Sequence, residues 1–206
     1  MTAVSLITLR ETFEASLIIG IVLAVLQQSE EERYAMFVWL GVIAGIVLSV
    51  LLAFLFHRSF GGFQGRAEEL YEGIAMLTAA ALIIWMVLWM LKQSKSMRKT
   101  VEEKVSRHLK NNHPLGIFFL VLVSTAREGV ETVIFLQAAA LHIDGSRQVL
   151  AGLFGIAVAV ALSYFIFTGI VRLPLKRFFQ VTSVLLILFA LDLAVHGVHE
   201  LQEALL

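Results

Sequence analysis

The sequence has no cysteine, only two prolines and few charged residues, which make up 16% of its 206 positions. Without cysteine there are no disulfides, thiolate metal sites or cysteine nucleophiles, so any metal ligands must be oxygen or imidazole groups. The formal net charge is zero, and nothing in the composition suggests nucleic-acid binding. No basic stretch precedes the first apolar segment and no small-residue cleavage site is evident, so we expect no removable signal peptide.

Hydrophobic residues, in contrast, are abundant: they form 59% of the chain, and the mean hydropathy is +0.86. This composition predicts an all-α integral membrane protein with a single transmembrane domain over residues 1–206. About 20 helical residues cross the hydrocarbon core of a bilayer. Six apolar segments reach that length, at residues 3–27, 35–56, 68–91, 114–141, 148–171 and 176–199.

Positively charged residues predict the orientation of these segments, because Lys and Arg are enriched in cytoplasmic loops. Most of them lie in the linker of about residues 92–113 and in the loop after the fifth segment. Both regions are therefore predicted to be cytoplasmic, and the amino terminus is predicted to lie outside. The linker carries Lys92, Lys95, Arg98, Lys99, Lys104, Arg107 and Lys110, and the loop carries Arg172, Lys176 and Arg177.

Two of the apolar segments contain the same charged pattern, Arg-Glu-x-x-Glu, which begins at Arg10 in the first segment and at Arg127 in the fourth. A charged side chain at the bilayer centre costs about 2.5–3.5 kcal/mol on insertion scales, whereas each Leu, Ile, Phe or Val returns only about 0.3–0.6 kcal/mol. Both helices are therefore expected to turn their charged faces into a helix bundle.

The two copies of the pattern lie 117 residues apart, and three segments separate the start of one from the start of the other. An odd number of crossings reverses the direction of the chain. The second half (about residues 114–206) is thus predicted to be inverted relative to the first (about residues 1–92). Such a 3+3 inverted repeat is common in transporters, and it brings helices one and four together near the midplane.

Within each copy, the charged residues share one helix face. At about 100° per residue, the Arg and both Glu fall within an arc of about 100°. Carboxylate oxygens suit hard cations, and the arginines are expected to orient them while no ion is bound. The predicted midplane metal site consists of Glu11, Glu14, Glu128 and Glu131 as ligands, with Arg10 and Arg127 as supporting charges. The alternative is that each copy is only a local ion pair that fixes helix packing.

Other polar residues give weaker signals. Glu72, near the start of the third segment, is a candidate cation-binding group at an outer mouth, although the helix dipole alone favours acids there. Near the end of the sixth segment, His196, His199 and Glu200 share one helix face. They form a second candidate metal site, although such residues are also common at membrane interfaces.

Apolar residues with distinctive side chains are expected to serve packing. Trp85 and Trp89 are interpreted as interface anchors, and Met90 as a packing residue rather than a copper ligand. Gly41 and Gly45 are spaced four apart, which would let a neighbouring helix approach closely.

With its two Arg-Glu-x-x-Glu copies, the sequence resembles the high-affinity iron permeases, also called the oxidase-dependent iron and lead transporters. The likeness extends over the chain and includes Glu72-Gly73, the region of Trp85 and Trp89, and the ending from His199 to Glu203. It implies import of ferric iron (Fe3+) across the plasma or inner membrane, with the four motif glutamates as ligands. Iron is then the transported substrate and not a prosthetic group. The resemblance also implies an extracytoplasmic ferroxidase as partner. Family members usually continue into a seventh helix, which this chain, ending at Leu206, lacks.

Other functions stay open on the residues alone. A transporter for a divalent metal (Fe2+, Pb2+ or Mn2+) would use the same carboxylates, and a metal sensor would bind without transport. A membrane-embedded di-iron enzyme would need Glu-x-x-His pairs, and the sequence has none, so we expect no enzymatic activity. A homo-oligomer is compatible with the sequence.

Overall fold

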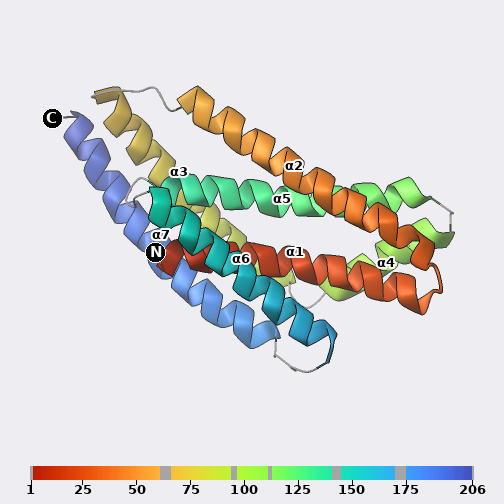
Figure 1. Ribbon diagram of the computed structural model, residues 1–206. Helices are drawn as coiled ribbons and strands as arrows, with labels where there is room; N and C mark the ends of the chain where they lie inside the picture. The colour runs from red at the N-terminus through yellow and green to blue at the C-terminus, as the bar shows by residue number, and fades with distance from the viewer. Residues whose placement is uncertain are drawn as a thin grey trace.

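The computed structural model describes residues 2–60, 66–93, 97–110, 113–140, 145–169 and 175–205, and within these ranges it contains helices and no strand. The all-α prediction is therefore confirmed (Figure 1). The helices are α1 (Thr2–Gln28), the short 3-10 helix η1 (Glu32–Tyr34), α2 (Ala35–Phe60), α3 (Arg66–Gln93), α4 (Met97–Lys110), α5 (Pro114–Ala140), α6 (Gly145–Phe167) and α7 (Leu175–Leu205).

Local sequence signals account for two of the helix ends. Pro114 occupies the first position of α5, where its missing N–H removes no helical hydrogen bond. After α6, Gly169 has a φ of 75°, a left-handed conformation that suits glycine and ends the helix. Its backbone N–H donates to the carbonyl of Ile166 at 3.1 Å.

Four of the helices are long and apolar enough to cross a membrane. The corresponding segments are Glu32–Leu55, which comprises η1 and most of α2, and Glu69–Met90, Val149–Phe167 and Arg177–Ala204 in α3, α6 and α7. Large apolar side chains along these helices are exposed, as expected of surfaces that face lipid. The chain is therefore a multi-pass membrane protein. Helices α1 and α5 are not among these four, so the count of six spans stays a prediction.

Helix α4 was not expected from the sequence, which indicated only a basic linker between about residues 92 and 113. It is amphipathic, and Val105 on its inner face is fully buried. This face packs against Val22, Val25 and Leu26 near the end of α1. The basic residues of α4 therefore lie at the end of the bundle where α1 ends and where α2 and α5 begin (Figure 1).

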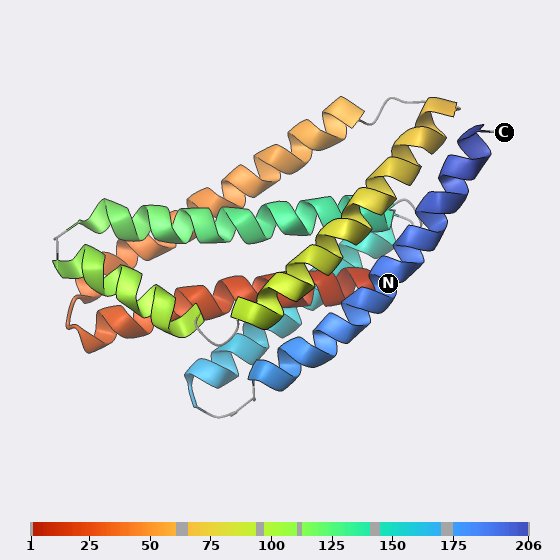
Figure 2. The same cartoon turned by 180° about the vertical axis from the view of Figure 1, so that it is seen from behind.

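Three extensively packed helix pairs build the bundle: α2 on α5, α6 on α1, and α3 on α7. Helices α1 and α5 also contact each other and lie at the centre of the arrangement (Figure 2). Near the start of both α1 and α6, the Ser5 hydroxyl donates to the carbonyl of Ala151 at 2.9 Å. Near their ends, the ring of Phe167 lies against Gly20. Helices α1 and α6 therefore run parallel.

Helices α2 and α5 also run parallel, and small residues allow their close contact. A Cβ added at Gly41 would lie 2.8 Å from the carbonyl oxygen of Phe118, and one at Gly45 would lie 2.7 Å from the Cβ of Thr125. The expectation that Gly41 and Gly45 allow close helix approach is thus confirmed.

Helices α3 and α7 run antiparallel. Gly73 near the start of α3 lies against Gly197 toward the end of α7. At the opposite end of the pair, Met90 and Phe179 belong to the same buried cluster as Phe13 of α1. This pair thus covers the side of α1 and α5 where the two motif arginines lie.

Candidate metal site

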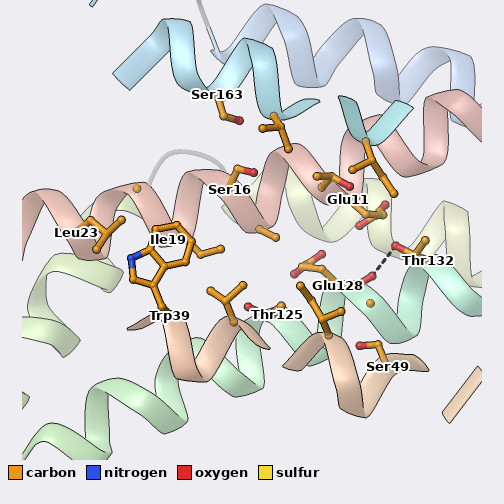
Figure 3. Close-up of a pocket in the computed structure, with 18 of the residues that line it drawn as sticks. Glu11, Ser16, Ile19, Leu23, Trp39, Ser49, Thr125, Glu128, Thr132 and Ser163 are labelled. Carbon is orange, nitrogen blue, oxygen red and sulfur yellow. Dashed lines mark hydrogen bonds between the residues drawn. The ribbon is translucent and has the colours of Figure 1, made fainter. Parts of the chain in front are cut away.

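The two motif helices bring three carboxylates together. One oxygen each from Glu11, Glu128 and Glu131 lies within 4.8 Å of the other two. Glu11 is 1% and Glu128 5% exposed, and Glu131 is half-buried. Figure 3 shows Glu11 and Glu128 reaching toward each other from α1 and α5. A small hard cation with metal–oxygen bonds of about 2.1 Å holds its ligands within about 4.2 Å of each other, so small side-chain adjustments would close this group around one ion.

Glu14 lies outside the group of three. It is buried, 4% exposed, one helical turn after Glu11. It interacts electrostatically with Arg10, Arg127 and Glu131. Sequence reasoning expected four equivalent ligands, whereas the structure places three within reach of one ion and the fourth beside both arginines.

Arg10 is fully buried and has an unusual partner. Its Nη2 donates to the thioether sulfur of Met90 at 2.8 Å, while Nε and Nη1 have no hydrogen-bond partner. Among the described residues, no carboxylate forms an ion pair with Arg10. The expected hydrogen bonds from Arg10 to the glutamates are therefore not formed in this structure. A buried guanidinium with unused donors is costly, which favours a carboxylate or water partner in another state.

Arg127 is held from two sides. Its Nε donates to Glu131 Oε1 at 2.8 Å, and its guanidinium carbon lies 4.4 Å from the centroid of the Trp89 ring. The local ion pair considered from the sequence thus forms in the second motif and not in the first. Trp89 and Met90 were expected to anchor and to pack, and their contacts with the arginines were missed because no spacing rule relates α3 to the motif helices.

A large cavity opens beside the carboxylates, between α1, α2, α5 and α6. It has a volume of about 930 Å³, and both Glu11 and Glu128 line it. Figure 3 shows the cavity between these carboxylates and the side chains of Leu23 and Trp39. Apolar side chains form most of its wall. Glu14 and Glu131 do not line it; atoms of Glu11 and Glu128 belong to its wall, while both carboxylate oxygens of Glu11 are enclosed.

The other predicted site residues lie apart from this group. Glu72 is half-buried near the start of α3. His196 and His199 are exposed on α7 and Glu200 is half-buried. These three do not come together: His196 Nδ1 lies 3.6 Å from Asp192 Oδ1, and His199 Nε2 lies 3.1 Å from Glu203 Oε1. Each imidazole reaches an acid four residues away on its own helix, since such side chains are neighbours. Among the described residues, Glu11, Glu128 and Glu131 are the one group of acids and imidazoles close enough to share an ion.

Comparison with known proteins gives a consistent result. The model of the iron permease FTR1 family matches residues 1–206. The protein "Ferrous iron permease EfeU" of Escherichia coli O6:K15:H31 is 33% identical over 201 residues, covering 97% of this chain and 73% of the relative. The protein of the same name from Yersinia pestis is 31% identical over 201 residues, covering 97% of this chain and 71% of the relative. An uncharacterized protein of Archaeoglobus fulgidus is 36% identical over 199 residues, covering 97% and 69%. No solved structure matches the chain.

Proposed function

This chain belongs to the iron permease FTR1 family, and we propose that it carries iron ions across a cell membrane through carboxylates supplied jointly by α1 and α5. The observation that carries the proposal is the convergence of Glu11, Glu128 and Glu131 inside the bundle. Ionisable residues at membrane depth mark ion pathways, and an all-oxygen ligand set suits a hard cation. Iron is the transported substrate, so this site must release it as well as bind it.

Glu14 completes the proposed ligand set. It lies on the same buried face of α1 as Glu11, three residues away, and it interacts electrostatically with Glu131 across the helix pair. In this proposal Glu14 and Glu131 share the ion with Glu11 and Glu128 along the contact between α1 and α5. When all six motif side chains are ionised, the four carboxylates and two guanidiniums have a formal charge of −2, which attracts a cation.

The six-span, 3+3 inverted repeat is part of this proposal. Its support is that each motif helix packs on the second helix of the other half: α1 packs on α6, and α5 packs on α2. Thr8 and Thr125 each stand two residues before a motif arginine. Gly155 packs against Thr8, and Gly45 packs against Thr125. Each glycine is the eleventh residue of its helix, so the two halves make corresponding contacts.

The proposed orientation places the amino terminus and the end of α7 outside the cell. The basic helix α4 supports it, because positively charged residues favour the cytoplasmic side. Glu72 and the exposed pair of His196 and His199 then lie toward the outer side. We propose Glu72 as a group that attracts cations at the outer mouth and the histidines as a place for handover from an extracytoplasmic ferroxidase.

Ferric iron is the form we propose, because four carboxylates make a hard and strongly anionic ligand set. Ferrous iron is the second candidate, since the relatives from Escherichia coli and Yersinia pestis are named ferrous iron permeases. Uptake of iron kept ferrous by ascorbate, compared with uptake of ferric citrate, distinguishes the two forms. Competition by Pb2+ or Mn2+ tests for a broader divalent-metal transporter.

The membrane potential supplies a driving force for import. An inside-negative potential of 100 mV contributes about 2.3 kcal/mol per elementary charge, or about 7 kcal/mol for a trivalent ion. Release from several carboxylates is the harder step. Arg10 is suited to assist it, because its two unpaired nitrogens would form ion pairs with Glu11 or Glu14 as the ion departs. Protonation of one or two glutamates would act in the same direction.

The decisive experiment measures uptake of radiolabelled iron by proteoliposomes containing the purified chain. We expect Glu128→Gln to reduce uptake to the level of empty liposomes, because it removes a charged ligand and preserves side-chain size. Glu103→Gln, on the exposed surface of α4, is the matched control and should transport normally. Normal uptake by the Glu128→Gln protein would refute the proposed function of this site.

A further inference from the structure

A thioether is the hydrogen-bond partner of a buried charge beside the candidate ligands. Met90 is 1% exposed and Arg10 is 0% exposed, and Nη2 of Arg10 donates to the sulfur of Met90 at 2.8 Å. The sulfur of methionine is only a weak acceptor. A buried guanidinium is ordinarily paired with a carboxylate, because an unpaired ion is costly to remove from water. Arg10 thus has a weaker partner than buried arginines usually have.

Carboxylates lie near Arg10 but do not pair with it. Glu11 and Glu14 are both buried, and both interact electrostatically with Arg10. Within the described residues, no ion pair joins Arg10 to an acid. Nε and Nη1 of Arg10 and both carboxylate oxygens of Glu11 have no hydrogen-bond partner. Donors and acceptors that could satisfy each other are therefore held apart.

The surroundings of Met90 explain why its sulfur is the acceptor. It packs in a buried cluster with Phe13, Leu17, Ala159 and Phe179, and these apolar side chains offer no acceptor of their own. Met90 belongs to α3, which packs most extensively on α7 and supplies no carboxylate to the group of three. The sulfur therefore holds the guanidinium on the side of α1 that faces α3 and α7.

The second motif shows what happens where α3 offers no acceptor. Arg127 lies against Trp89, the residue before Met90, with its guanidinium carbon 4.4 Å from the ring centroid. The indole ring presents a face to the cation, and its one polar group is a donor. Arg127 donates instead to Glu131 of its own motif at 2.8 Å. Of the two arginines, the one with the thioether partner is the one that leaves its motif glutamates unpaired.

We propose that Met90 is a positioning residue, whose sulfur holds Arg10 away from the carboxylates of Glu11 and Glu14 and so keeps these oxygens free to bind iron. The charge of Arg10 stays near enough to offset part of the repulsion between the carboxylates. It does so without charge-assisted hydrogen bonds, which an entering ion would have to break. Because a thioether is a weak acceptor, Arg10 leaves it readily when the ion departs. This inference rests on the proposed function and names the residue that controls one of its arginines.

The test replaces the sulfur with an apolar side chain of similar volume. Met90→Leu removes the acceptor, and such exchanges are well tolerated in protein cores. We expect Arg10 then to pair with Glu11 or Glu14, so that entering iron must break a charge-assisted hydrogen bond. Affinity for iron, measured by equilibrium dialysis with ferric citrate, should fall about tenfold. Met86→Leu, one turn earlier on α3 where Met86 is 6% exposed, is the matched control and should bind iron as the wild type does.

Transport should change in a way that a packing defect does not reproduce. In proteoliposomes the KM of Met90→Leu for iron should rise by a similar factor, while the maximal rate should not fall, since Arg10 displaces the ion more readily. Loss of folded protein would instead lower the maximal rate. Met90→Gln provides the rescue, because its amide oxygen accepts a hydrogen bond from Arg10 and should restore the KM to near the wild-type value. A lower iron affinity in Met90→Gln than in Met90→Leu would overturn the inference, because a purely apolar role of Met90 predicts that order.

A double-mutant cycle identifies Arg10 as the residue through which Met90 acts. In the background of Arg10→Gln, Met90→Leu should cause no further loss of iron affinity. An equal loss in both backgrounds would overturn the inference. Wild-type affinity in Met90→Leu would also overturn it and would leave the carboxylate site intact. Failure of the proposed function is recognised separately, by normal uptake in Glu128→Gln.

A last measurement needs neither iron nor transport. Met90→Gln places an amide oxygen beside the donors of Arg10, whereas Met86→Gln buries the same amide in a cluster of apolar side chains that includes Ile83 and Leu186. A buried polar group without a partner is destabilising. Met86→Gln should therefore unfold in detergent at a lower temperature than Met90→Gln, as followed by circular dichroism. Equal unfolding temperatures would show that Arg10 is not directed at position 90 and would overturn the inference.

Discussion

The guanidinium of Arg127 lies over the indole ring of Trp89, with 4.4 Å between its carbon and the ring centroid. The next residue along α3, Met90, accepts a hydrogen bond from Arg10 at 2.8 Å. Two consecutive side chains of α3 thus contact both motif arginines, although α3 contributes no carboxylate to the group of three. This helix therefore positions the positive charges that flank the candidate ligands.

The first prediction concerns Trp89. Trp89→Leu removes the aromatic face that holds Arg127, and a partly buried cation–π contact contributes about 1–2 kcal/mol. Since 1.4 kcal/mol corresponds to about tenfold, this loss predicts that iron uptake falls by about five- to thirtyfold. Trp89→Phe should retain part of the activity. Initial uptake rates in proteoliposomes measure the effect.

The control for this prediction is Trp85→Leu, one turn earlier on α3, where the side chain is 72% exposed. Its uptake should match the wild type. If Trp85→Leu and Trp89→Leu lower uptake equally, the tryptophans act through membrane anchoring and the positioning role of Trp89 is wrong.

The second prediction separates the motif glutamates. Glu11→Gln should abolish high-affinity iron binding, because Glu11 belongs to the converging group and lines the cavity. Glu14→Gln should keep measurable binding, since Glu14 lies outside that group, but it should lose uptake because the ion cannot pass along α1. Equilibrium dialysis and proteoliposome uptake on the same preparations give the two values.

Binding should also weaken as the pH is lowered, because protons and the metal compete for the same carboxylate oxygens. The direction follows from the ligand chemistry: only ionised carboxylates bind the ion well.

For the comparison of Glu11→Gln with Glu14→Gln, the Glu103→Gln variant on α4 serves as control for the loss of one acid. If Glu14→Gln and Glu11→Gln lose binding to the same extent, the separation of Glu14 from the group of three is wrong.

Much of this arrangement follows from the sequence because its signals are local or repeated. Six apolar segments, set by length and hydropathy, agree with α1, α2, α3, α5, α6 and α7 to within a few residues at most ends. The repeated motif, with its charges too costly to face lipid, indicated that the first and fourth segments meet, and α1 does contact α5. These are properties of single helices or of a pattern that occurs twice.

What the sequence did not reveal depends on contacts between distant side chains. Helix α4 was hidden because charge dominates its composition, although Val101, Val105 and Leu109 recur at a helical spacing and pack on α1. Nothing in the sequence distinguishes Arg10, bonded to Met90, from Arg127, bonded to Glu131. In this structure His196, His199 and Glu200 are not close enough together to share an ion, and each imidazole lies beside an acid four residues away on α7.

The third prediction concerns the tight crossing of α2 and α5. A Cβ added at Gly129, inside the second motif, would collide with the side chain of Ser49, whose hydroxyl donates to the carbonyl of Gly45 at 2.8 Å. Gly129→Ala should therefore lower the stability in detergent by about 1–3 kcal/mol, as overpacked cores do. Thermal unfolding followed by circular dichroism measures this effect.

Two companion variants test the explanation. Gly152→Ala places its Cβ 3.7 Å from Thr8 Cγ2, an ordinary contact, and should leave the unfolding temperature unchanged. Adding Ser49→Gly to Gly129→Ala should restore part of the lost stability, because it removes the colliding atoms. If Ser49→Gly gives no rescue, the steric account is incorrect.

The last prediction concerns topology and uses the absence of cysteine from the chain. Lys99→Cys on α4 and His199→Cys on α7 each introduce one thiol at an exposed side chain, 83% and 68% exposed respectively. Three proposed spans separate the two positions, so the thiols should lie on opposite sides of the membrane. The positive charges of α4 favour the cytoplasm, so an impermeant maleimide added to intact cells should label only His199→Cys. Lys99→Cys should become reactive after the cells are opened, which also serves as the expression control. Labelling of both thiols in intact cells would contradict the odd number of crossings between them, and with it the inverted repeat that brings Glu11 to Glu128 from opposite directions.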